Sequence, residues 1–161
     1  MHKLKWQKFL FCLVIIFLLA CMTGCTAAGN SGDQQTQPGN ETGTTVVQVE
    51  QGQSYSTKDE VAAYIHEFHS LPSNFITKEE ARDAGWDNSQ GNLWEVTDNK
   101  SIGGDYFGNR EGLLPRADGR KYFECDINYN GGYRGSERII YSNDGLIFYT
   151  NDHYESFEQL Y

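Results

Sequence analysis

Cysteine is nearly absent from the larger part of this chain, which excludes a fold held together by disulfides. Of the 4 cysteines, those at positions 12, 21 and 25 lie near the N-terminus, and only Cys125 lies beyond them. We expect Cys125 to be a small buried residue of a strand. Glu124 beside it would raise the pKa of the thiol, which argues against a catalytic cysteine.

Basic charge is also in short supply. The chain has 13 Lys+Arg against 22 Asp+Glu, a formal net charge of −9. Residues 55–161 alone hold 10 of these basic and 19 of these acidic side chains. Such a region does not attract nucleic acid by its overall charge. If it acts on a polyanion, a local group of basic side chains must bind that polyanion.

The N-terminus is a predicted targeting segment. Three lysines precede an unbroken apolar run over residues 9–20, which suits a signal peptide and is short for a membrane span. Residues 22–25 resemble a lipoprotein cleavage box, so we expect a signal peptide over residues 1–25 and lipidation of Cys25; Cys21 also fits. An ordinary secretory signal and an uncleaved anchor are the alternatives. Each places the rest of the chain outside the cytoplasm, either secreted or held at the cell surface.

A polar tether and one domain follow. Residues 26–54 are rich in Gly, Thr, Gln, Asn and Ser and contain no aromatic residue, which predicts a flexible tether. Such a segment spans roughly 30 Å root-mean-square. Residues 55–161 are the predicted domain, with enough apolar and aromatic side chains for a core.

Helices are predicted in the first half of this domain. Thr57 with Glu60, and Thr77 with Glu80, have the spacing of capping boxes, each of which begins a helix. Apolar residues at helical spacing follow the first box. Residues 92–96 predict a third, short helix.

Strands are predicted in the second half, where the apolar pattern changes to alternation between glycine-rich turns. The predicted strands cover residues 101–107, 121–128, 136–141, 146–150 and 156–159. Helices followed by successive strands indicate an α+β fold, with the helices on one face of a five-stranded antiparallel sheet. The other face would be free to bind a ligand.

An ordered set of motifs in this domain resembles the barnase and binase type of extracellular, guanyl-preferring bacterial ribonucleases. No single motif is specific, but all keep the family's order and spacing over about two thirds of the chain. The motifs are Leu71-Pro72-Ser73-Asn74-Phe75-Ile76-Thr77-Lys78, Gly85-Trp86, Lys100-Ser101-Ile102-Gly103-Gly104-Asp105, Asn109-Arg110-Glu111-Gly112, Asp126-Ile127-Asn128-Tyr129, Tyr133-Arg134, Arg138-Ile139 and Thr150-Asn151-Asp152-His153-Tyr154.

The resemblance implies an endoribonuclease that needs no metal or cofactor. In the family the 2′-hydroxyl of RNA attacks its own phosphate, a 2′,3′-cyclic phosphate forms, and water later opens the ring. By resemblance Glu124 is the base for the 2′-hydroxyl and His153 the acid for the leaving oxygen. The residue types suit these roles, because a carboxylate is ionised at neutral pH and an imidazole exchanges protons there.

Three cations match family positions that stabilise the charged transition state, namely Lys78, Arg134 and Arg138. An arginine offers a fork of donors to phosphate oxygens, which a lysine does not. Without the resemblance, these cations would be read as solvated side chains or as partners of nearby acids such as Glu137. Lys78 lies in the first turn of a predicted helix, where the helix dipole disfavours a cation, and this misfit favours a functional role.

The resemblance also implies a guanine site. Glu111 would accept hydrogen bonds from the N1 and N2 groups of guanine, and the backbone amides of Asn109 and Arg110 would meet O6. Phe107 and Tyr154 would stack on bases. The position before Asn109 is usually serine in the family and is glycine here, which gives the loop more freedom.

Other matched residues are expected to be structural. Arg120 and Asp144 correspond to a family ion pair, and Asp105 is expected to orient the guanine-site loop or arginine groups rather than to act as an acid. Trp86, Trp94 and Ile139 are candidate core residues.

Three interpretations remain open from the sequence. The first is a surface-tethered, monomeric, guanine-preferring endoribonuclease, and the second is a non-catalytic RNA- or protein-binding module on the same fold. The third is a toxin domain that uses the same chemistry. The family suggests a barstar-like protein inhibitor as a partner. Because the domain is acidic, we expect weaker RNA affinity and a lower optimal ionic strength than for a basic relative.

Overall fold

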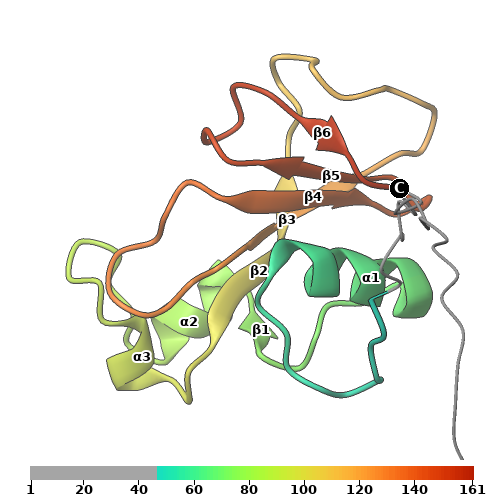
Figure 1. Ribbon diagram of the computed structural model, residues 1–161. Helices are drawn as coiled ribbons and strands as arrows, with labels where there is room; N and C mark the ends of the chain where they lie inside the picture. The colour runs from blue at the N-terminus through green and yellow to red at the C-terminus, as the bar shows by residue number, and fades with distance from the viewer. Residues whose placement is uncertain (1–46) are drawn as a thin grey trace, which may run out of the picture. The chain divides into compact units, whose positions relative to one another are not determined.

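The structure, a computed structural model, describes residues 47–161, and its centre is one sheet (Figure 1). The strands pair in chain order, antiparallel from β2 to β6, while β1 lies parallel to β2. Their bounds are Phe75–Ile76 (β1), Ser101–Phe107 (β2), Tyr122–Asp126 (β3), Arg138–Ser142 (β4), Ile147–Thr150 (β5) and Glu158–Gln159 (β6). The α+β prediction with five antiparallel strands is confirmed. It missed β1, because two residues are too few to show alternation.

The helices are α1 (Lys58–Phe68), α2 (Lys78–Asp83) and α3 (Leu93–Val96). The capping box at the start of α2 is present, with Thr77 and Glu80 each bonding to the backbone of the other. The box predicted before α1 is wrong. There the Thr57 hydroxyl donates to the Glu60 carboxylate at 2.6 Å, and the Thr57 side chain accepts no backbone N–H.

One face of the sheet packs on α1, as Figure 1 shows. The buried residues of this core come from α1, from β3 to β5 and from the residue after β3: Val61, Ala62, Ile65, Cys125, Ile127, Ile139 and Ile147. Trp86 is buried in a second cluster beside β2, as predicted. Trp94 is not a core residue, because it is 36% exposed. Its indole N–H donates to the Lys100 carbonyl, and its ring covers Gly131 at the surface.

The opposite face of the sheet is partly covered by other side chains. Its apolar residues Tyr122, Ile140 and Phe148 form a third cluster with Leu114, and Phe107, Tyr154 and Phe157 pack against it. Loops after β2 and β5 therefore cover one end of this face. Because side chains alternate along a strand, Glu124 and Asp126 of β3 share this face with Tyr122. The candidate site lies at Glu124 and Asp126, next to the part of this face that the loops cover.

Hydrogen bonds to the domain begin before Tyr55. The Glu50 amide donates to the Tyr55 hydroxyl at 2.9 Å, and the Gly52 amide donates to the Tyr64 hydroxyl at 3.0 Å. The predicted signal peptide, the Cys25 site and most of the predicted tether lie outside the described residues. Within residues 47–161, no helix is both long enough and apolar enough to cross a bilayer.

Candidate active site

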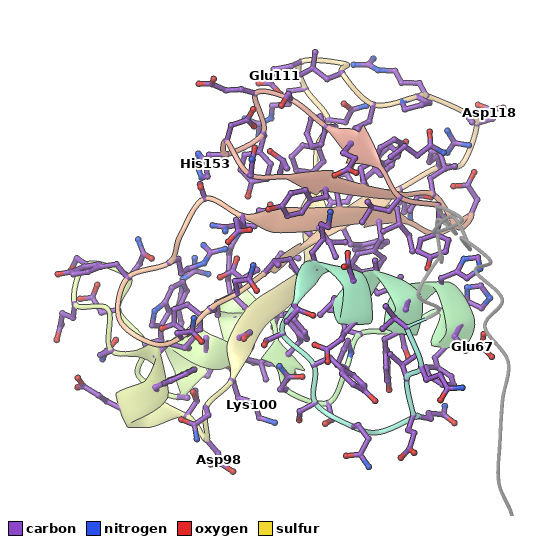
Figure 2. The ribbon with its side chains drawn as sticks, in the orientation of Figure 1. Glu67, Asp98, Lys100, Glu111, Asp118 and His153 are labelled. Carbon is purple, nitrogen blue, oxygen red and sulfur yellow. The ribbon has the colours of Figure 1, made fainter. Side chains whose placement is uncertain are left out.

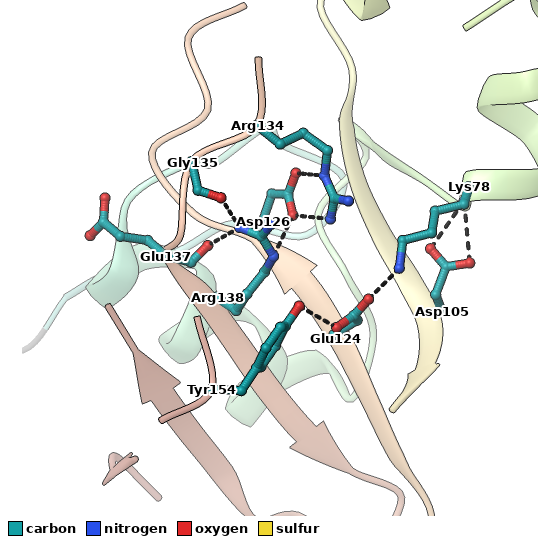
Figure 3. Close-up of polar contacts among 9 residues, drawn as sticks. All are labelled: Lys78, Asp105, Glu124, Asp126, Arg134, Gly135, Glu137, Arg138 and Tyr154. Carbon is teal, nitrogen blue, oxygen red and sulfur yellow. Dashed lines mark hydrogen bonds and ion pairs between the residues drawn. The ribbon is translucent and has the colours of Figure 1, made fainter. Parts of the chain in front are cut away.

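Glu124 is a buried carboxylate at the centre of β3, and it is 6% exposed. Its Oε1 atom pairs with the Lys78 ammonium, and its Oε2 atom accepts a hydrogen bond from the Tyr154 hydroxyl at 2.7 Å (Figure 3). Burial by itself raises the pKa of Glu124, but the bonds from Lys78 and Tyr154 and the charge of Arg134 outweigh it, so the pKa lies below its ordinary value. Glu124 is therefore ionised at neutral pH.

Lys78 reaches Glu124 from the first residue of α2. Its backbone N–H donates to the Asp105 carboxylate, with N–O distances of 3.0 and 3.3 Å. Asp105 pairs with Glu124 across β2 and β3. Asp105 was predicted to orient the guanine-site loop or arginine groups, but its carboxylate instead holds the N-terminus of α2 beside the sheet. A negative group at this end also stabilises the helix.

Arg134 and Arg138 converge on one acid, Asp126, which is 2% exposed. Arg134 forms two parallel bonds to the Asp126 carboxylate, from Nε at 2.7 Å and from Nη2 at 2.6 Å. The Nε atom of Arg138 lies 2.9 Å from the same carboxylate. Arg138 also donates from Nη1 to the carbonyls of Gly135 and Glu137. A buried carboxylate therefore fixes both guanidinium groups beside Glu124.

His153 and Tyr154 lie on a strained loop after β5. Their φ angles are 59° and 78°, in the left-handed region that non-glycine residues rarely adopt. Asp152 holds the loop, because Oδ1 accepts from the Thr150 hydroxyl and from two backbone amides, while Oδ2 accepts from the Ser156 hydroxyl. These bonds, led by that from Ser156, lower the pKa of Asp152 to about 2.

The same loop connects the candidate acid to the candidate base. The Tyr154 ring lies 4.7 Å from the His153 ring, measured between centroids, while its hydroxyl bonds to Glu124. Burial and the bond to Glu124 raise the pKa of Tyr154 to about 12, so this hydroxyl stays protonated and remains a donor at neutral pH. His153 is exposed to solvent.

A pocket of about 710 Å³ opens beside His153, and all five residues of the predicted guanine site line it. Phe107 and Tyr154 stack at 5.3 Å with an angle of 29° between their rings. Figure 2 shows Glu111 and His153 at the same end of the molecule. The lining residues are Tyr106, Phe107, Gly108, Asn109, Arg110, Glu111, Leu113, His153, Tyr154 and Glu155.

Hydrogen bonds within the loop that carries Glu111 hold it in place. The Asn109 side chain is buried and bonds to both the N–H and the carbonyl of Leu114, at 3.1 and 2.9 Å. The Arg116 Nη2 atom donates to the Asn109 carbonyl at 3.2 Å and lies against Gly112. The side chain of Asn109 is thus structural.

The structure brings Lys78, Glu124 and Tyr154 into one group of contacts and Arg134 and Arg138 into a second group around Asp126, with the charge of Arg134 near enough to lower the pKa of Glu124. Asp126 and Asp152 are part of the family motifs, but sequence reasoning gave neither a role; Asp126 holds the two arginines and Asp152 holds the loop of His153 and Tyr154. Strand alternation gave a signal for Asp126, two residues after Glu124, and Asp152 lies between the Thr150 and Ser156 hydroxyls that it binds.

The predicted ion pair between Arg120 and Asp144 is present, with a shortest distance of 2.7 Å. Burial is the main reason that the pKa of Cys125 lies well above its ordinary value.

Comparison with known proteins gives the family. A family model described as ribonuclease matches residues 58–161. The chain belongs to this ribonuclease family. A ribonuclease of Heyndrickxia coagulans is 51% identical over 105 residues, which cover 65% of this chain and 96% of that protein. A ribonuclease of Bacillus intermedius is 51% identical over 105 residues and is covered over 65% of its length. The guanyl-specific ribonuclease St of Saccharopolyspora erythraea is 44% identical over 55 residues, 34% of this chain and 54% of that protein.

Proposed function

We propose that this ribonuclease is an endonuclease that cleaves single-stranded RNA after guanosine, by transesterification to a 2′,3′-cyclic phosphate and later hydrolysis. The observation that carries the proposal is the position of Tyr154. It bonds to the Glu124 carboxylate, contacts the His153 ring and lines the pocket of the guanine-site residues. A base, an acid and a base-binding pocket are therefore neighbours in one network.

In the proposed first step, Glu124 removes the proton from the 2′-hydroxyl of the guanosine. The 2′-oxygen forms a bond to phosphorus, the bond from phosphorus to the 5′-oxygen breaks, and His153 donates a proton to that oxygen. In the second step the roles reverse. His153 takes a proton from water as the water oxygen bonds to phosphorus, the bond from phosphorus to the 2′-oxygen breaks, and Glu124 returns its proton to that oxygen. The lowered pKa of Glu124 suits the first step, because the carboxylate is ionised before substrate binds.

The charge that develops on phosphate would meet fixed cations. Lys78 contacts Glu124 directly, and the charge of Arg134 is near enough to lower the pKa of Glu124. Because Asp126 holds both arginines in place, they need little reorganisation when the transition state forms. Cations arranged in advance stabilise the transition state more than they stabilise the bound substrate.

Guanine preference is proposed from the pocket and from one relative. Glu111 lines the pocket, and a carboxylate there can accept from N1 and N2 of guanine together. The backbone amides of Asn109 and Arg110 are proposed to meet O6, and the loop that presents them is held by Asn109 and Arg116. The name of the Saccharopolyspora relative describes that protein as guanyl-specific.

The test uses the dinucleotides GpU, ApU, CpU and UpU in the presence of a chelator, with products separated by chromatography. We expect guanosine 2′,3′-cyclic phosphate from GpU first and guanosine 3′-phosphate later, with GpU cleaved fastest. Glu124→Gln and His153→Gln should each lower kcat/KM about 100- to 10,000-fold. Unchanged rates in both variants would remove the assigned roles, and equal rates on all four dinucleotides would remove the guanine preference.

A further inference from the structure

Three aromatic side chains form a row across three neighbouring strands. Tyr106 of β2 pairs with Phe123 of β3, and Phe123 pairs with Tyr141 of β4. The ring centroids of Tyr106 and Phe123 are 6.5 Å apart at 86°, and those of Phe123 and Tyr141 are 5.6 Å apart at 31°. Tyr106 is 67% exposed, and the other two are partly exposed. We call these three residues the aromatic row.

The aromatic row starts at the base pocket and leads away from it. Phe123 precedes Glu124 on β3, so its side chain lies on the opposite face of the sheet from the candidate base. Tyr106 lines the pocket of Glu111 and His153. It also lies beyond the short β1, which pairs with β2 only at Ser101 and Ile102. Register partners on neighbouring strands point to the same face of a sheet, so the aromatic row lies on the α1 face, and Tyr106 is the member that also lines the base pocket.

The far end of the aromatic row opens into a second pocket, of about 390 Å³, within the size range of small-ligand sites. Phe123 and Tyr141 line it together with His66 and His69 at the end of α1, and Asn143 adds an amide. None of the described residues that line this pocket is a carboxylate, in a chain whose net charge is −9. A pocket lined by two imidazoles and no carboxylate suits a ligand with negative charge, and its aromatic side chains suit a ligand with flat rings.

We propose that the aromatic row binds unpaired nucleotides that flank the cleaved guanosine, by stacking their bases on Tyr106, Phe123 and Tyr141. The inference rests on the proposed function, because it extends the base pocket that function requires. Base stacking on aromatic rings tolerates any sequence, because every base has a π-face. It gives this acidic ribonuclease a way to hold a longer RNA strand where general attraction to phosphate is weak.

The test measures Kd by fluorescence anisotropy for two RNAs that resist cleavage, each with a 2′-O-methyl group on its one guanosine. One is a dinucleotide, read out by competition, and the other is a labelled single strand extended on both sides of the guanosine. We expect Phe123→Leu, which keeps apolar bulk and removes the ring face, to weaken binding of the long RNA about tenfold. Its kcat/KM on GpU should stay unchanged.

Two further variants make the test specific. Tyr106→Leu changes a largely exposed residue, so folding should be unaffected, and it should also reduce the affinity ratio of long to short RNA. Tyr133→Leu changes another exposed tyrosine, 72% exposed and outside the aromatic row, and should leave that ratio unchanged. Melting curves confirm that each variant is folded.

The two proposals fail in different ways. A wild-type protein that does not cleave GpU contradicts the proposed function. Normal cleavage of GpU, with the same ratio of affinities in the wild type, Phe123→Leu and Tyr106→Leu, overturns the aromatic row as an RNA site. So does a change in self-association, measured by sedimentation, that accompanies these substitutions without any change in RNA affinity.

Discussion

The proposed base and the proposed acid are held by very different parts of the molecule. Glu124 lies in the middle of β3, is 6% exposed, and bonds to side chains from α2 and from the loop after β5. His153 lies on that loop, is exposed, and has a φ angle of 59°. The position of the base depends on burial and ion pairs, whereas the position of the acid depends on the local bonds of Asp152.

This difference separates stability from catalysis. Removing one of the buried ions around Glu124 and Asp126 exposes or orphans its partners, so changes there should lower the free energy of unfolding. Asp152 is not a core residue, so changing it should leave the protein folded and misplace the acid. Each variant below is chosen to break or sharpen this contrast, and the largest expected effect comes first.

Asp126→Asn should have the largest effect. It leaves two guanidinium groups beside a neutral amide, and breaking a buried pair in this way costs about 3–5 kcal/mol. Urea unfolding measures the change. Asp144→Asn is the matched control, because it breaks the more exposed pair with Arg120 and should cost much less. Equal losses in the two variants would contradict the role given to Asp126.

Asp152→Ala should spare the fold at neutral pH and lower kcat on GpU about 10- to 100-fold, because the loop no longer holds His153 in position. The depressed pKa adds a second signature. The Asp152 carboxylate stabilises the wild type above its ordinary pKa near 4, and this contribution is lost as the pH falls towards 2. Unfolding curves of wild type and variant should therefore converge in acid. An unchanged kcat would show that Asp152 does not position the acid.

Tyr154→Phe removes one of the bonds that lower the pKa of Glu124, so that pKa should rise. The acid limb of the profile of kcat/KM against pH should move to higher pH, because the base stays protonated over a wider range. The same change reduces the stability that ionised Glu124 supplies above its ordinary pKa and loses in acid. Tyr149→Phe is the control, since that hydroxyl bonds to Glu137 instead. An acid limb that stays in place would contradict the bond's role.

Arg116→Ala should have the smallest effect, and it acts on specificity. The variant loses the bond to the Asn109 carbonyl at 3.2 Å, which is worth about 0.5–1.5 kcal/mol. The ratio of GpU to ApU cleavage should fall a few-fold while the pH profile stays the same. Arg82→Ala removes a cation that lies over Trp86, away from this loop, and should not change the ratio.

The sequence predicted the sheet and the site to different degrees. Alternation over residues 101–107 and 146–150 predicted β2 and β5 closely, because both strands are long enough to show period two. Phe75–Ile76 gave no such signal, and its pairing depends on contacts with β2. Trp94 was misplaced, because composition does not show that its indole N–H finds an acceptor at the surface.

The sequence predicted which residues form the site, but it did not predict the contacts between them. The family resemblance identified Glu124, Lys78 and both arginines, but the convergence of Arg134 and Arg138 on Asp126 depends on the pairing of Asp126 with Arg138 across β3 and β4. The bond from Tyr154 to Glu124 depends on the positive φ angles of the loop, which the sequence does not reveal. The sequence therefore did not predict the pairing register of distant strands or the backbone strain of the loop.

The most direct test of the paired roles of Glu124 and His153 is the pH profile of kcat/KM for cyclisation of GpU by the wild type, Glu124→Gln and His153→Gln. We predict a bell-shaped profile for the wild type, with the acid limb absent in Glu124→Gln and the alkaline limb absent in His153→Gln. An acid limb that persists in Glu124→Gln, or an alkaline limb that persists in His153→Gln, would contradict this account.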